Sequence, residues 1–370
     1  MENNNAKPHA LNRSVECQTL TLGRGNTKRE YISLLNVLAC QAVIILHTNG
    51  IFWSHPTGSL WITSNFLETF FYPAVPIFYM ISGATLLNYR DRYNTRTFLK
   101  RRFLKTGIPF IFWSCISGMY SVLILKQSFD RNPLHIIDNI FNTRYFSIYW
   151  FFIPLFAIYL SIPILSLVPQ KIEMCRYAST VGLVFIGILP LICSLVGITY
   201  NEGLTPPVVG GSIIFVFLGY YFANVELSKA KRYFIYLLGI AGWAVHFAGT
   251  IFLSAGQQEI NGTFKGYTNI PSLLHSIACF VFVKELLNSS NHFSNIIASE
   301  KIGTIINRLS ALTFGIYLLH FYFVCTLPMY LPINRGSLVW RIGGAIGIFW
   351  VCAFITWAIQ KVPLLRKLVP

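Results

Sequence analysis

Residues 31–52 read YISLLNVLACQAVIILHTNGIF and contain no Asp, Glu, Lys or Arg. A helix needs about 20 mostly apolar residues to cross the roughly 30 Å of hydrocarbon in a bilayer. This stretch is long and apolar enough, so we expect it to be a membrane-spanning helix. Its single imidazole, His47, falls near the end of the stretch.

The same pattern recurs nine more times, which predicts an all-α polytopic integral membrane protein with about ten transmembrane helices. The composition agrees, because 54% of the 370 residues are hydrophobic and only 11% are charged, whereas a soluble domain has about 25% charged residues. The expected spans are about 31–52, 66–88, 104–125, 148–168, 178–199, 208–225, 232–255, 270–288, 309–331 and 338–360.

The distribution of basic residues predicts which segments face the cytoplasm. Cytoplasmic loops of membrane proteins carry an excess of Lys and Arg. If the N-terminus is cytoplasmic, 23 of the 29 Lys and Arg fall in cytoplasmic segments and 6 fall outside. Both termini are therefore expected to be cytoplasmic. The net charge of +16 is explained by topology, so we expect no nucleic-acid partner.

This topology divides the chain into a cytoplasmic N-terminal tail (1–30), a ten-helix membrane domain (31–361) and a cytoplasmic C-terminal tail (362–370). The polar first 30 residues do not resemble a cleavable signal peptide. Eight cysteines fall mostly within the expected spans and form no CxxC pair. We therefore expect neither a disulfide framework nor a metal site.

Ionisable side chains inside the spans are the first candidates for function, because they are costly in hydrocarbon. His47 and Glu68 fall at similar expected depth on consecutive helices, where a carboxylate beside an imidazole suits a general base. A packing role for His47 is an equal alternative. Asn36 and His47 are eleven residues apart, so they share a helix face about 16 Å apart. That face either lines a crevice or packs on other helices through polar contacts.

A basic run precedes the third expected span. It consists of Arg90, Arg92, Arg96, Lys100, Arg101, Arg102 and Lys105. One interpretation is topology combined with binding of anionic membrane lipid. The other is a phosphate-binding rim that includes Arg101, Arg102 and Lys105, because Arg matches phosphate bidentately.

Five segments together resemble a known family. They are YISLLNVLACQAVIILH (31–47), VPIFYMISGATLL (75–87), FLKRRFLKTGIPFIFWS (98–114), YWFFIPLFAIYLSIPIL (149–165) and FGIYLLH (314–320). In this order they are similar to the helix signatures of membrane acyltransferase family 3, the polysaccharide O-acetyltransferases. Each segment is weak alone, but the five cover nearly the whole chain in order.

The resemblance implies an enzyme that moves an acyl group, acetyl by default, from cytoplasmic acetyl-CoA or another acyl-CoA to a hydroxyl. The acceptor it implies is a glycan or glycolipid, and the site is the bacterial cytoplasmic membrane. The family's first-helix histidine matches His47, its coenzyme-A-binding basic residues match Arg101 and Arg102, and its late-helix histidine matches His320. No metal is implied.

One position departs from the family. Many members carry an Arg eleven residues before the first-helix histidine, where this chain has Asn36. The change removes a fixed cation near the acyl donor. We expect Asn36 and His320 to contribute to substrate binding.

These inferences combine into a mechanism in which His47 removes the proton of the acceptor hydroxyl and Glu68 stabilises the resulting imidazolium. The outer segment 127–147 is expected to face the acceptor. The alternative functions are a transporter or flippase of a lipid-linked sugar and a membrane scaffold without chemistry. The sequence does not indicate an oligomeric state. The outer segment carries Asp130, Arg131, His135, Asp138 and Arg144.

Overall fold

The computed structural model describes residues 30–128, 131–168, 171–288, 292–297 and 299–370. These residues form helices and connecting segments and contain no strand. The predicted tail at 1–29 and Asp130 lie outside the described residues. The α-helices after an N-terminal helix at residues 30–48 are α2 (Gly58–Phe71), α3 (Ala74–Leu86), α4 (Thr95–Arg102), α5 (Ile108–Leu123), α6 (Pro133–Phe141), α7 (Phe152–Leu165), α8 (Ile172–Gly182), α9 (Leu189–Leu195), α10 (Ile213–Asn224), α11 (Lys229–Ser254), α12 (Ile270–Asn288), α13 (His292–Ile297), α14 (Glu300–Tyr330) and α15 (Ala345–Lys361).

Several of these helices join end to end into longer spans. The π-helical turns η3 (Phe103–Gly107), η6 (Leu183–Ile188) and η8 (Val339–Gly344) join α4 to α5, join α8 to α9 and precede α15. Within the described residues, nine helical segments are long and apolar enough to cross a membrane. They are Glu30–Ser54, Gly58–Asp91, Thr95–Leu123, Ser147–Leu165, Ile172–Leu195, Lys229–Ser254, Ile270–Asn288, Glu300–Tyr330 and Val339–Lys361.

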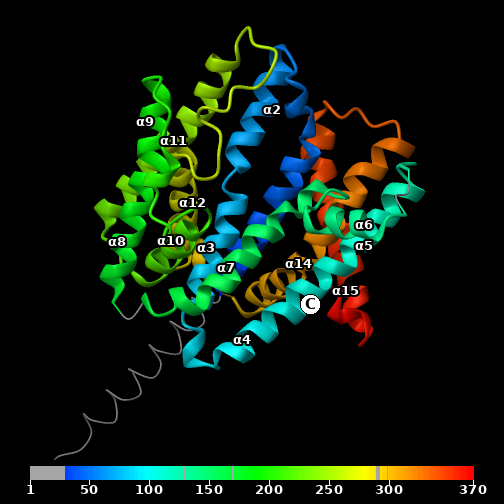
Figure 1. Cartoon of the computed structure of the whole chain (residues 1–370), viewed down its shortest axis with the longest axis horizontal. Helices are drawn as coiled ribbons and strands as arrows, with labels where there is room; N and C mark the ends of the chain where they lie inside the picture. Colours follow the sequence, from blue (N-terminus) through cyan, green and yellow to red (C-terminus); the bar gives the residue numbers. More distant parts are fainter. Residues whose placement is uncertain (1–29, 129–130, 169–170, 289–291, 298) are drawn as a thin grey trace, which may run out of the picture.

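The outside of the helix bundle is apolar. Phe252, Val339 and Phe354 are among many large hydrophobic side chains that lie exposed. A water-facing surface of this kind would be an aggregation site, whereas lipid solvates it. The prediction of an all-α polytopic membrane protein is confirmed (Figure 1).

The sixth expected span, 208–225, differs from the prediction. The structure has only the 12-residue helix α10 there, preceded by irregular chain. Arg90, which follows α3, donates a hydrogen bond to Ser166 at the end of α7. Helices α3 and α7 therefore end at the same face of the bundle, and α8 starts at that face. Between α9 and α11 the chain returns to that face, and Tyr200 donates to the Phe185 carbonyl on η6. This irregular chain is largely exposed, since Leu204 and Val208 are 57% and 58% exposed.

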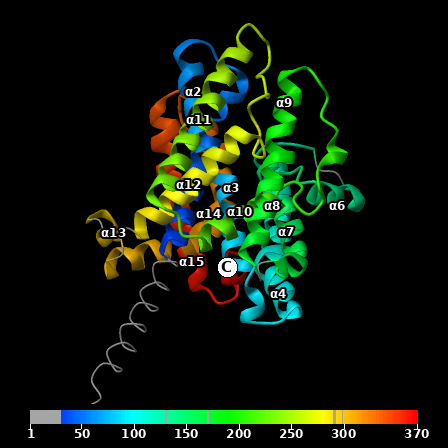
Figure 2. The same ribbon diagram turned by 90° about the vertical axis from the view of Figure 1, so that its left-hand side faces the viewer.

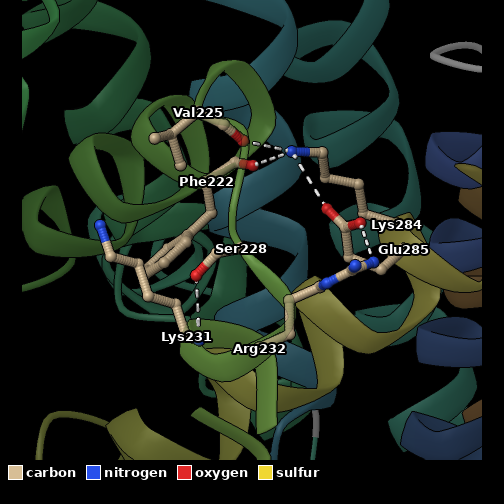
Figure 3. Close-up of polar contacts among 7 residues, drawn as sticks. All are labelled: Phe222, Val225, Ser228, Lys231, Arg232, Lys284 and Glu285. Atoms are coloured by element: carbon tan, nitrogen blue, oxygen red, sulfur yellow. Dashed lines mark hydrogen bonds and ion pairs between the residues drawn. The ribbon is translucent and has the colours of Figure 1, made fainter. Parts of the chain in front are cut away.

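The end of this short helix is capped by a buried lysine (Figure 3). Lys284 of α12 donates to the carbonyls of Phe222 and Val225 at 2.9 and 2.7 Å. A cation at a helix C-terminus satisfies free carbonyls and complements the helix dipole. Glu285 accepts from Arg232 of α11 at 2.8 Å, which ties α11 to α12. These two helices lie side by side in both views (Figures 1 and 2).

The contact of α10 with α3 depends on two glycines. A Cβ on Gly83 would lie 2.0 Å from the Val216 carbonyl oxygen, and one on Gly219 would lie 1.9 Å from that of Met80. Small residues at such positions let the backbones of membrane helices approach closely. Close contact between the backbones of α3 and α10 therefore holds the short helix in place.

We expect Gly83→Ala to lower the free energy of unfolding by about 3 kcal/mol, because the added methyl forces α3 and α10 apart. Thermal unfolding in detergent measures this change. Gly347→Ala is the matched control, since a Cβ there meets nothing within 4 Å. Equal midpoints for the two variants would contradict the close packing of α3 on α10.

Candidate active site

Polar contacts join the N-terminal helix to α14. Ser33 Oγ donates to Asn307 Oδ1 at 2.6 Å, and Asn36 Nδ2 donates to Ser310 Oγ at 3.3 Å. One turn further along, Cys40 Sγ donates to the carbonyl oxygen of a residue on α14 at 3.6 Å. The residue numbers of each pair differ by 273 or 274, so the two helices run parallel. We call this row of contacts the polar seam.

The polar seam leads to two histidines. The imidazole rings of His47 and His320 lie 5.2 Å apart between centroids and are tilted by 38°. His320 Nδ1 lies 2.7 Å from the Tyr317 carbonyl oxygen. A carbonyl only accepts, so Nδ1 of His320 carries the proton. Its Nε2 is then an acceptor, and it is buried without a hydrogen-bond partner among the described residues.

His47 lies where two cavities meet. The outer cavity has a volume of about 620 Å³ and the inner cavity about 150 Å³. Val43, one turn before His47, lines only the inner cavity, whereas Gly50, which follows it, lines only the outer one. Trp53 lines both cavities, as do Leu46, Ile148 and Trp150. His320 is fully buried and lines neither of these cavities. His47 is therefore open to a ligand in either cavity, and the buried ring of His320 packs against it.

Glu68 is ion-paired, but to a residue other than the expected histidine. Its Oε1 lies 2.5 Å from Nζ of Lys265, and the two side chains are only 5% and 9% exposed. The ammonium of Lys265 also lies 4.3 to 4.9 Å from the ring centroids of Phe52, Trp53 and Tyr72. The described contacts include no hydrogen bond between Glu68 and His47, although both line the inner cavity.

The basic residues of the expected phosphate rim occupy the opposite end of the bundle from α2 (Figure 1). The Arg102 guanidinium lies between the rings of Phe98 and Tyr159, at 5.8 and 5.6 Å from their centroids. Arg101 and Lys105 are exposed. The Arg101 guanidinium lies 4.6 Å from the Tyr93 ring centroid. This end therefore presents cations to an anion, with Arg101 and Arg102 both held by cation–π contacts.

The other predicted residues have separate locations. Asn36 belongs to the polar seam and lines neither the inner nor the outer cavity. The segment 127–147 contains α6, and in it Arg144 pairs with Asp138. Of the described residues of this segment, only Ser147 at its end lines the outer cavity. The roles assigned to these residues stay predictions.

Sequence reasoning missed a buried guanidinium that contacts a residue just after His47. Arg341, on η8, is 2% exposed and donates to Asn49 Oδ1 at 3.3 Å and Thr63 Oγ1 at 3.0 Å. Its own carbonyl accepts from Thr48 Oγ1 at 2.8 Å. Arg341 therefore holds the two residues that directly follow His47. A signal was present, because Arg341 falls inside the expected span 338–360, where a charge is a functional candidate.

A family model described as an acyltransferase domain matches residues 29–357, from the start of the N-terminal helix into α15. The chain belongs to acyltransferase family 3. Comparison with curated proteins and with solved structures gives no match. This enzyme is a membrane acyltransferase, and the histidine pair is the candidate for its catalytic site. The transporter, flippase and scaffold alternatives are set aside.

The arrangement suits acyl transfer to a hydroxyl. An imidazole at a cavity junction can reach a nucleophile on one side and an acyl group on the other. General-base help of this kind contributes about 10²–10⁴ in rate. The position of His47 between the two cavities of the acyltransferase is the geometry that such a base requires.

Proposed function

We propose that this acyltransferase moves an acetyl group from cytoplasmic acetyl-CoA to a hydroxyl of a cell-surface glycan or its lipid-linked precursor, in the bacterial cytoplasmic membrane. The observation that carries the proposal is the position of His47, which lines both an inner and an outer cavity. A donor from one face and an acceptor from the other meet at this imidazole.

The donor occupies the predicted cytoplasmic side. Its phosphates bind Arg101, Arg102 and Lys105, and its thioester reaches the inner cavity. That cavity, at about 150 Å³, has room for about five water-sized groups. An acetyl group fits this space, and a long fatty acyl chain would have to extend beyond it. The size of the inner cavity therefore supports acetyl as the transferred group.

The reaction proceeds by base-assisted attack. His47 accepts the proton of the acceptor hydroxyl while that oxygen bonds to the thioester carbonyl carbon. The carbon–sulfur bond then breaks, and the imidazolium returns its proton to the sulfur. The products are the acetyl ester and free coenzyme A. Because the Nδ1–H of His320 donates a hydrogen bond to the Tyr317 carbonyl oxygen, its Nε2 remains available as an acceptor for the His47 ring.

The purified protein in proteoliposomes tests the proposal, with radiolabelled acetyl-CoA on one side and glycan on the other. We expect radiolabel in the glycan when glycan is present, and slow release of free acetate when glycan is absent. Mass spectrometry of surface glycans from cells with and without the gene identifies the acceptor. Absence of both transfer and hydrolysis would overturn the proposed function.

The double variant Arg101→Gln/Arg102→Gln is expected to raise the KM for acetyl-CoA about tenfold or more, since each charged hydrogen bond contributes about 1.5–3 kcal/mol. The KM for the acceptor should stay unchanged. Lys229→Gln/Lys231→Gln is the matched control, because both lysines are exposed on α11 at the same predicted face. A rise in the acceptor KM alone would refute the phosphate assignment.

A further inference from the structure

Basic residues on the predicted outer face are few, and three of the six have a partner. Arg144 pairs with Asp138, and Lys265 pairs with Glu68. The guanidinium of Arg341 is buried against Asn49 and Thr63. The remaining three, which are exposed, are Lys126, Arg131 and Arg335.

Of these three, Arg335 lines the outer cavity together with His47. Neither Lys126 nor Arg131 lines it. The contacts of the described residues give Arg335 no hydrogen bond and no carboxylate partner. A cation left without a counter-ion in the cavity that holds the catalytic base is available to an anionic ligand.

The loop that carries Arg335 is held in a fixed turn. Asn334 Oδ1 accepts from the Gly336 backbone N–H at 2.9 Å, and the Asn334 carbonyl accepts from that of Ser337 at 3.1 Å. The turn packs on α2, since a Cβ on Gly336 would lie 3.3 Å from Leu60 Cδ2. Arg335 is thus presented from a constrained backbone, which lowers the entropy cost of binding.

The rest of the outer cavity suits a sugar. Trp53 and Trp150 line it and are 63% and 39% exposed. Exposed indole faces pack well against the apolar C–H faces of sugar rings, while their N–H groups bond hydroxyls. The cavity volume of about 620 Å³ holds about 20 water-sized groups, roughly two sugar rings.

We propose that the acceptor is an anionic glycan, and that Arg335 binds a carboxylate or phosphate on it while a nearby hydroxyl lies at His47. The inference rests on the proposed function and adds the charge of its substrate. The planar guanidinium fork matches either oxyacid bidentately. Arg335 is then a specificity-determining residue for the acceptor.

The test uses the full-length protein in proteoliposomes with three acceptors that differ at one carbon. These are matched oligosaccharides in which one sugar is glucose, glucuronic acid or glucose 6-phosphate. We expect the wild-type enzyme to show a KM at least tenfold lower for an anionic acceptor than for the neutral one. The two anionic arms show whether carboxylate or phosphate is preferred.

Arg335→Gln should raise the KM for the anionic acceptor about tenfold or more and leave the neutral one unchanged, which removes the preference. Lys126→Gln, at an exposed cation outside the cavity, should keep the preference. No preference in the wild-type enzyme, an unchanged preference in Arg335→Gln, or its loss in Lys126→Gln would overturn the inference. Acceptor-independent hydrolysis of acetyl-CoA reports separately on the proposed function.

Discussion

His47→Ala is expected to lower the rate of acetyl transfer by about 10²–10⁴-fold, the usual contribution of a general base. The imidazole of His47 lines both cavities, so its loss removes the group that takes the acceptor proton. Because the effect is on chemistry, kcat should fall while the KM for acetyl-CoA changes little. Rapid-mixing measurement of radiolabel transfer in proteoliposomes gives both parameters.

His55→Asn is the control for this variant. His55 lies at the same predicted face with a backbone φ of 46°, a left-handed conformation that Asn tolerates. It should retain wild-type activity. His320→Asn should lose less activity than His47→Ala and shift the pH–rate profile, because in the proposed mechanism His320 acts through the His47 ring. Wild-type transfer by a correctly folded His47→Ala protein would refute the mechanism.

Glu68→Gln is expected to lower the free energy of unfolding by about 3–5 kcal/mol, because it leaves the buried Lys265 ammonium without its carboxylate. Lys265→Met should cost a similar amount by leaving the carboxylate unpaired. The double variant Glu68→Gln/Lys265→Met should recover much of the loss, since neither charge then remains. Thermal unfolding in detergent measures all three.

An exposed ion pair provides the matched control. Arg176 and Glu173 pair on the surface with side chains 62% and 63% exposed. Glu173→Gln should cost no more than about 1 kcal/mol. Equal losses in Glu68→Gln and Glu173→Gln would contradict a buried pair. If the double variant is stable but transfers slowly, Glu68 also contributes to the chemistry.

Much of the fold follows from periodicity and charge, because lipid imposes a length on every crossing segment. Nine expected spans correspond to long apolar helices. The sixth does not, since Pro206 and Pro207 and the glycines after them break the helix before α10 begins. Apolar content alone does not distinguish a full helix from a short one preceded by irregular chain.

The candidate site was only partly predictable for a related reason. The sequence indicated His47 and His320 separately, each from its own segment. Their proximity depends on the packing of two helices far apart in sequence. Lys265 was assigned to an outer loop as a topological charge, and Glu68 was expected beside His47. A sequence pattern places residues at a depth in the membrane, whereas helix packing decides which of them meet.

The polar seam has a consequence for how the enzyme is made. Its two helices are separated by about 270 residues of sequence, so His320 leaves the ribosome long after the first helix has entered the membrane. The contact between the two imidazoles cannot form until α14 inserts next to that helix. A nascent chain therefore carries His47 without its neighbouring imidazole, and the histidine pair is absent until most of the bundle is complete.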